Sequence, residues 1–147
     1  MISVLHTHRV AANAYLIFDD RFLMLKRAKE PFIWGPPGGK LEIDEDPIRG
    51  LQREVKEETG LQIRVFQPVT TWFGYFKDQS LLSVDYLCTS KKNTVTLSHE
   101  HTHHRWLTII DLAHDKNIYF TSDLGFKLSD FKLAWQTYIM NKHKNVK

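Results

Sequence analysis

Three glutamates are concentrated in one short segment of the chain, and their spacing suits a metal site. Glu54, Glu57 and Glu58 lie within the segment 47–59, which we expect to be helical. At about 100° per residue, the three side chains share an arc of about 100° on one face of that helix. Neighbouring carboxylates repel one another, whereas Mg²⁺ is held by a few carboxylates together with substrate phosphates. The pattern therefore indicates either a magnesium site or a solvated acidic face.

Two neighbours of these acids favour the metal site. Arg53 precedes Glu57 by four residues, so its guanidinium can orient that carboxylate. Gly50 lies one turn before the first acid on the same face. Because glycine inside a helix costs about 1 kcal/mol relative to alanine, its presence needs a reason. The missing side chain predicts either room for a metal and a phosphate or tight packing against the loop at Gly38 and Gly39.

The elements that must position the acids can be predicted from helix caps, chain breakers and apolar runs. Asp46 is a suitable N-cap, Pro47 suits the first helical position, and Gly60 suits the residue after the helix. The proline- and glycine-rich stretch 30–39 must be a loop or an irregular strand edge. Strands are expected at 9–18, 22–27, 61–71, 81–89 and 105–110, and a last helix at 130–141 with Ser129 as its cap. This mixture predicts a mixed sheet with helices packed on it.

The whole chain, 1–147, is expected to form one domain. Its 147 residues suit a single core, and the 42% apolar and 25% charged residues exclude disordered and coiled-coil proteins. No stretch approaches the ~18 consecutive apolar residues of a membrane span. The single cysteine, Cys88, excludes an internal disulfide and is expected only to pack in a strand.

Charge and the N-terminal sequence bear on partners and location. The net charge of +3 is mild, and the basic tail 142–147 is expected to be solvated rather than to bind a nucleic acid polymer. The apolar run 10–18 follows basic residues as in a signal peptide, but Asp19, Asp20 and Arg21 come next instead of a cleavage site. A buried strand, a cytoplasmic location and no membrane partner are therefore expected.

One run of the sequence carries a family resemblance. The residues from Gly39 to Leu61, GKLEIDEDPIRGLQREVKEETGL, resemble the Nudix box, G-x5-E-x7-R-E-U-x-E-E-x-G-U, where U is aliphatic. Every defined position matches: Gly39, Glu45, Arg53, Glu54, Val55, Glu57, Glu58, Gly60 and Leu61. The chain is thus similar to small MutT-like members of the Nudix hydrolase family. This resemblance implies an α/β (α+β) fold, an α/β/α sandwich around a mixed sheet, with the box forming a catalytic loop–helix–loop.

The resemblance also implies a reaction and roles for residues. Family members cleave a pyrophosphate linkage in a nucleoside diphosphate joined to another moiety, with Mg²⁺ or Mn²⁺ as cofactor. The side chains of Glu54, Glu57 and Glu58 and the carbonyl of Gly39 would hold two or more ions, and Arg53 would orient Glu57. Such ions screen the phosphate charge, generate hydroxide and stabilise the leaving phosphate. No serine or cysteine nucleophile is implied.

Further candidates lie beyond the box. Similar family members place an additional metal-binding or basic glutamate in a loop near position 100, so Glu100 is a candidate metal ligand and general base; the alternative is a surface acid. Four histidines surround it: His99, His101, His103 and His104. Their spacing fits no usual structural zinc pattern. A polar edge strand is the expected explanation, and a phosphate contact or an imidazole base is the alternative.

Candidate substrate-binding residues are basic or aromatic. Arg27 and Lys40 stand on either side of the glycine-rich loop and are candidate phosphate contacts. Trp72 and Tyr75 belong to the aromatic run 72–76 and are candidates for stacking a nucleobase. Packing in a core or an interface is the alternative for at least two aromatic residues of this run.

The expected function is cleavage of a nucleoside or deoxynucleoside triphosphate to the monophosphate and pyrophosphate, by a monomer or homodimer. An ADP-ribose hydrolase is less favoured, because there is no N-terminal extension and Lys77 stands where that subgroup has proline. Dinucleoside polyphosphates are the second candidate substrates. Family members that act on them have a tyrosine a few residues further past the box than Tyr75 lies. A non-catalytic nucleotide-binding module and an allylic diphosphate isomerase are alternatives from other classes, and the complete set of acids argues against both.

Overall fold

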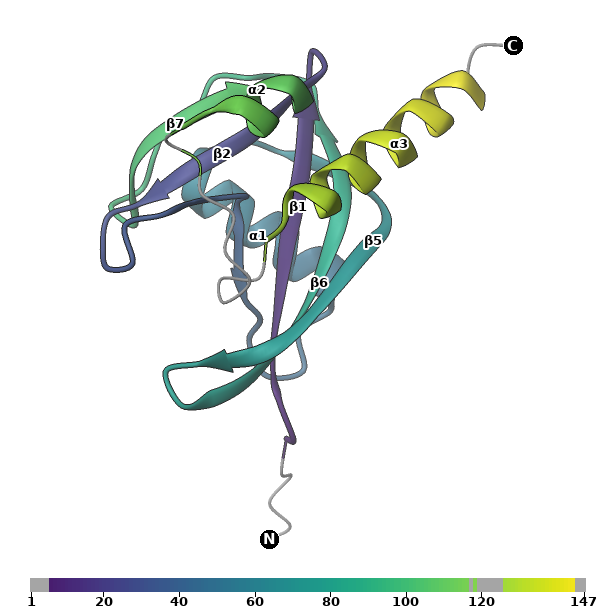
Figure 1. Ribbon diagram of the computed structural model, residues 1–147. Helices are drawn as coiled ribbons and strands as arrows, with labels where there is room; N and C mark the ends of the chain where they lie inside the picture. The colour runs from purple at the N-terminus through teal and green to yellow at the C-terminus, as the bar shows by residue number, and fades with distance from the viewer. Residues whose placement is uncertain (1–5, 117, 119–125, 145–147) are drawn as a thin grey trace, which may run out of the picture.

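Figure 1 shows the computed structural model of this chain, which describes residues 6–116, 118 and 126–144. The strands are β1 (Arg9–Phe18), β2 (Arg21–Arg27), β3 (Trp34–Gly35), β4 (Gly38–Lys40), β5 (Ile63–Phe76), β6 (Gln79–Ser90) and β7 (His101–Leu107). The helices are α1 (Pro47–Thr59), α2 (Ile109–His114) and α3 (Leu128–Lys144). Within the described ranges, none of these helices is long and apolar enough to cross a membrane.

The strands form one mixed sheet with β1 near its centre. The main path runs β3-β2-β1-β6-β5, while β4 also pairs with β1, and β7 pairs with β2. β1 and β6 are parallel, with residues 9–17 opposite 81–89. The other pairs are antiparallel. The mixed sheet predicted from the sequence is therefore confirmed.

Helices cover both faces of the sheet, because β1 is apolar on both sides. Alternate residues of a strand point to opposite faces. Ala14 and Leu16 belong to the core that contains Leu51 of α1, whereas Tyr15 belongs to the core that contains Phe131 of α3. In Figure 1, α1 lies behind the sheet, and α2 and α3 lie on the opposite side. This arrangement is the expected α/β/α sandwich, and the free cysteine, Cys88, is buried in the core on the α1 side.

Local sequence signals place α1 as predicted. The side chain of Asp46 accepts a hydrogen bond from the backbone N–H of Arg49 at 3.0 Å, and Pro47 occupies the first helical turn. Gly60 adopts the left-handed conformation, with φ 76°, and its N–H donates to the carbonyl of Lys56. Glycine adopts this conformation at little cost, so the helix ends there.

The C-terminal part of the sheet differs from the prediction. β7 begins at His101, four residues before the expected start, and the strand ends at Leu107 because a helix follows. The side chain of Thr108 accepts a hydrogen bond from the N–H of Asp111, whose carboxylate accepts one from the N–H of Thr108. This capping box begins α2. Ile109 and Ile110, expected at the end of a strand, therefore lie in α2.

Two further boundaries differ. Lys77 and Asp78 both have positive φ, which makes a tight turn that extends β5 through the aromatic run and joins it to β6. α3 begins at Leu128, since the carboxylate of Asp130 accepts a hydrogen bond from the N–H of Lys127. The prediction of Ser129 as the cap is thus wrong, because that residue lies in the first turn. In the basic tail, 142–144 continues α3, and 145–147 falls outside the described residues.

Candidate active site

The acids of α1 lie at the edge of the helix's buried face, with very different exposure. Leu51 and Val55 are fully buried and fix the orientation of the helix against the sheet. The side chain of Glu58 is only 4% exposed, that of Glu54 is 16% exposed and that of Glu57 is 59% exposed. The three acids are therefore a graded series from the core to solvent rather than one solvated face.

Glu58 is the most strongly perturbed carboxyl group of this series. Burial raises its pKa to about 8, and the negative charges of Glu54 and Glu100 act in the same direction. The backbone N–H of Gly38 donates a hydrogen bond to Oε1 of Glu58 at 2.8 Å, which opposes this rise. Burial also raises the pKa of Glu54. Burial and mutual repulsion thus disfavour the ionised forms of these carboxyl groups. A nearby cation would stabilise the ionised forms.

Arg53 connects the acids to one another. Its Nε and Nη2 atoms each donate to a different oxygen of Glu45, both at 2.8 Å. Its Nη1 atom also donates to Glu54 at 3.1 Å and to Glu57 at 3.3 Å. The guanidinium lowers the pKa of Glu45 to about 2. Arg53 thus contacts Glu57 as predicted, but its paired, fork-like contact is with Glu45, whose role the sequence left open.

Two glycines allow close approach around α1. A Cβ atom on Gly39 would lie 2.7 Å from Oε2 of Glu54, so a side chain at this position would displace that carboxylate. A Cβ atom on Gly50 would lie 2.5 Å from Leu41 Cδ2 and 2.7 Å from Glu45 Oε1. The prediction that Gly50 leaves room for a metal and a phosphate is therefore wrong. The space is filled because the segment after β4 folds back onto the helix.

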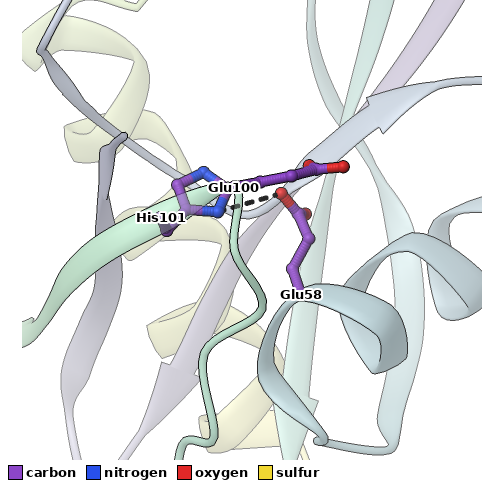
Figure 2. A group of neighbouring side chains, drawn as sticks. All are labelled: Glu58, Glu100 and His101. Carbon is purple, nitrogen blue, oxygen red and sulfur yellow. Dashed lines mark ion pairs between the residues drawn. The ribbon is translucent and has the colours of Figure 1, made fainter. Parts of the chain in front are cut away.

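The segment that carries Glu100 is fixed to α1 and β2 by backbone hydrogen bonds. The N–H of Ser98 donates to the carbonyl of Glu58 at 3.2 Å, and the N–H of Ala28 donates to the carbonyl of Glu100 at 2.9 Å. This anchoring brings Glu100 and the next residue, His101, over the end of α1. Candidate ligand atoms of Glu58, Glu100 and His101 all lie within 4.8 Å of one another, and Figure 2 shows the three side chains converging.

Glu54, Glu58 and Glu100 line a cavity of about 560 Å³. Its wall brings together Gly39, Glu54, Glu58 and Glu100 with Arg27, Lys40, Trp72 and Phe76. Arg27 and Lys40 place their cationic groups 5.9 Å and 5.3 Å from the centre of the Phe76 ring. The Nε atom of Arg27 is buried and has no hydrogen-bond partner in the described part of the chain. The wall of the cavity thus combines acidic side chains with basic and aromatic ones.

Not every candidate from the sequence reaches this cavity. Tyr75 is 71% exposed and contacts Phe73, because it points to the opposite side of β5 from Trp72 and Phe76. Arg53 and Glu57 do not line the cavity; Arg53 contacts its wall by donating to Glu54, and it also donates to Glu57. Strand alternation separates the aromatic run into two faces, which the sequence could not orient.

The donor set fits a divalent cation. Glu58 and Glu100 offer carboxylate oxygens close together, and His101 offers a ring nitrogen. Among the other histidines of this region, His99 also lines the cavity. His103 and His104 are exposed on β7, an edge strand that pairs with β2, as a polar edge strand was expected to be. The sequence drew attention to the histidine cluster but gave no means of choosing His101 from it.

A buried polar network beneath the cavity was also not predicted. Asp85 is 1% exposed and accepts hydrogen bonds from Asn13 at 2.9 Å, Thr70 at 3.2 Å and Ser83 at 3.4 Å. Burial raises the pKa of Asp85 to about 6. Asn13 and Ser83 also line the cavity. The available signal was polar residues inside two apolar strands, Asn13 in β1 and, opposite it in β6, Asp85 with Ser83 two residues before it.

Comparisons with known proteins place the chain in a family. Residues 7–124 match the family described as NUDIX domain. A MutT-like protein of Streptomyces ambofaciens is 31% identical over 103 residues, which cover 69% of this chain and 64% of that protein. An asymmetrical bis(5'-nucleosyl)-tetraphosphatase of Caenorhabditis elegans is 30% identical over 95 residues, which cover 61% of this chain and 69% of that protein. The chain thus spans about two thirds of the length of these relatives.

The fold is shared with solved structures. The crystal structure of a MutT protein from Methanosarcina mazei superposes with a TM-score of 0.75 and 20% identity, covering 92% of this chain and 99% of that one. Together, the sandwich, the complete box and the family match define the class of this protein. The chain belongs to the NUDIX domain family, which confirms the resemblance found in its sequence.

Proposed function

We propose that this chain is a divalent-metal-dependent pyrophosphohydrolase acting on nucleotides. The observation that carries the proposal is that one cavity is lined by Glu54, Glu58 and Glu100 together with Arg27 and Lys40. A polyphosphate substrate needs both the basic and the acidic residues. The basic side chains can bind the terminal phosphates, while metal ions held by the acids screen the phosphate that is attacked. No side-chain nucleophile is required.

The metal-binding set would comprise Glu54, Glu57, Glu58 and Glu100, with the Gly39 carbonyl as a further ligand. When bound, Mg²⁺ or Mn²⁺ supplies charge neutralisation and lowers the pKa of water. Arg53 keeps the box carboxylates in place through its hydrogen bonds. Glu100, on the segment anchored over α1, is the candidate base that accepts the proton of the attacking water. Trp72, on the wall of the same cavity, offers a face for a nucleobase.

Nucleoside or deoxynucleoside triphosphates are the proposed substrates, with the monophosphate and pyrophosphate as products. Tyr75 supports this choice over a dinucleoside polyphosphate, because it does not reach the cavity. The similarity to a tetraphosphatase of Caenorhabditis elegans favours the dinucleoside polyphosphate, which is the second candidate.

Phosphate release from a panel of nucleotides tests the proposal. Triphosphates, dinucleoside tetraphosphates and ADP-ribose would each be incubated with the protein and Mg²⁺, with and without an added inorganic pyrophosphatase. We expect free phosphate from triphosphates only when the pyrophosphatase is present, and none from the variant Glu58→Gln. The dinucleoside tetraphosphate, ADP-ribose and excess-EDTA arms are read by chromatographic separation of the nucleotides, since none of them gives a phosphate signal through the Mg²⁺-dependent pyrophosphatase, and we expect no monophosphate in EDTA. Full turnover in excess EDTA would overturn the metal-dependent mechanism. Binding of nucleotides without turnover in any arm would show a non-catalytic module instead.

A further inference from the structure

His101 carries a buried ring nitrogen that makes no hydrogen bond within the described part of the chain. The side chain of His101 is 11% exposed, and its Nδ1 atom makes no hydrogen bond to any part of the chain that the structure describes. Buried polar atoms are nearly always paired, so an exception calls for an explanation such as a bound ion. The strand register explains how the ring comes to be buried, since His101 begins β7 directly opposite Arg27.

The nearest acidic group to this nitrogen is one of the proposed metal ligands. Nδ1 of His101 lies 3.4 Å from Oε2 of Glu58, whose side chain is 4% exposed. This separation exceeds the roughly 2.7–3.2 Å of a good N–H···O hydrogen bond. Figure 2 shows the ring directed at the carboxylate of Glu58, with the side chain of Glu100 passing beside both.

The spacing of the three donors suits joint binding of one cation better than direct pairing. All three candidate ligand atoms lie within 4.8 Å of one another. Ligand atoms at about 2.1 Å from an octahedral ion are about 3.0–4.2 Å apart, depending on whether they are neighbours or opposite. A small adjustment of the Glu100 side chain, which is exposed, would close the remaining difference.

We propose that Nδ1 of His101 is a ligand of a divalent cation shared with Glu58 and Glu100, and that this imidazole makes the position favour first-row transition ions over Mg²⁺. Imidazole suits Zn²⁺, Cu²⁺, Fe²⁺ and Ni²⁺, whereas Mg²⁺ prefers oxygen ligands. Mn²⁺ also takes mainly oxygen ligands, so a ring nitrogen bound to Mn²⁺ is a stringent test of the proposal. The proposal specifies the metal preference of the proposed function, but its test below measures metal binding and does not depend on turnover.

The direct test is pulsed electron paramagnetic resonance of the wild-type protein with Mn²⁺ and no nucleotide. We expect a hyperfine coupling from a directly bound nitrogen, which changes to the ¹⁵N pattern when the protein is produced with ¹⁵N-labelled histidine. Absence of a histidine nitrogen coupling in Mn²⁺-loaded protein would overturn the proposal. No substitution is involved, so a folding defect cannot obscure the result.

Matched variants assign the coupling to one histidine. His101→Gln should remove the nitrogen signal and weaken Mn²⁺ binding, measured by calorimetry, by at least the roughly 10- to 100-fold that loss of an outer-shell partner costs. Binding of Mg²⁺ should weaken less. His103→Gln is the control, because His103 is an exposed histidine on the same strand whose Nδ1 lies 2.8 Å from the hydroxyl of Thr102. A signal that survives His101→Gln, or equal loss of Mg²⁺ and Mn²⁺ affinity, would contradict the assignment.

The two proposals fail in different ways. Nucleotide hydrolysis without a nitrogen coupling would leave the proposed function standing and overturn the role of His101. A nitrogen coupling without hydrolysis of any nucleotide would leave the metal site standing and overturn the proposed function.

Discussion

Arg53 is the residue on which the geometry of the acidic site most depends. Its guanidinium contacts Glu45 through two hydrogen bonds, and it also reaches Glu54 and Glu57. The contacts with Glu54 and Glu57 all come from the Nη1 atom and are longer, at 3.1 Å and 3.3 Å, so the fork formed with Glu45 sets the orientation of the group. A planar fork is a property of arginine that lysine lacks. The positions of the carboxylates should therefore depend on the planar guanidinium of Arg53 and not only on its positive charge.

The variant Arg53→Lys tests this dependence. It keeps the positive charge but cannot form the paired contact with Glu45, so the carboxylates of Glu54 and Glu57 should lose their fixed positions. We expect affinity for Mn²⁺ to fall about 10- to 100-fold, as for loss of an outer-shell partner, with kcat falling as well. Calorimetric titration with Mn²⁺ and steady-state kinetics would measure the two effects. Unchanged values for both would show that charge alone suffices.

Glu100 is the candidate general base, and its anchored backbone restricts how it can act. Because Ala28 and Ser98 hold the backbone on both sides of it, only the side chain can move over the cavity. Glu100→Gln should lower kcat by roughly 10²- to 10⁴-fold, the usual contribution of a general base. His103→Asn should have little effect. If kcat stays normal in Glu100→Gln, another residue must accept the proton.

At the scale of elements, α1 is determined mainly by its own ends. Asp46 begins the helix, Gly60 ends it, and Leu51 and Val55 bury one face. The carbonyls at its C-terminal end are in turn paired with the segment before β7, where Ser98 donates to the carbonyl of Glu58. The helix therefore positions the acids, and its last turn also positions the segment that carries Glu100.

Removal of the N-cap should destabilise the protein without changing its chemistry. Asp46→Ala should lower the free energy of unfolding by about 0.5–2 kcal/mol, measured by urea denaturation. Asp46→Asn, which retains an acceptor for the N–H of Arg49, is the control and should be close to wild type. KM and kcat measured well below the melting temperature should be unchanged in both variants, since Asp46 does not line the cavity. Loss of activity in the stably folded Asp46→Asn protein would contradict this separation of roles.

At the scale of the whole molecule, the sheet separates two cores and also contains a buried charge. Asp85 lies between Asn13 and Thr70, and it is the most deeply buried carboxyl group of the described residues that is not part of the acidic site. Asp130 of α3 adds a repulsive charge. The carboxyl group is therefore more easily protonated in the folded protein than in the unfolded chain.

This difference predicts the direction of a pH effect on stability. The pKa of Asp85 is raised from 3.8 to about 6 by burial, so the folded state binds more protons than the unfolded state between these values. Stability should then fall as the pH rises, by about 2 kcal/mol between pH 4 and pH 6 and by about 3 kcal/mol over the whole titration of this group. Asp85→Asn lacks this titration, so its free energy of unfolding relative to wild type should rise over the same range. A difference that is constant from pH 4 to pH 7, measured by urea denaturation, would contradict the prediction.

The sequence alone determined the features that depend on neighbouring residues. The bounds of α1, the placement of its acids and the turn between β1 and β2 all follow from caps, periodicity and turn residues, whose physics is local. The box was also sufficient to identify the family and, through it, the α/β/α sandwich. The helix α2 and the cap of α3 were missed although the hydrogen bonds of Thr108 and Asp130 that begin these helices are local as well. The start of β7 was missed because pairing with β2 sets it.

Tertiary structure decided which distant residues share the cavity. Glu58 and His101 are far apart in sequence, and they meet because backbone hydrogen bonds attach the segment before β7 to the end of α1. Trp72 reaches the cavity and Tyr75 does not, because the register of β5 fixes which face each side chain occupies. Gly50 is packed rather than open, since Leu41 folds back from a different element. Each of these outcomes depends on how separate elements pack together, which residue spacing along one element does not specify.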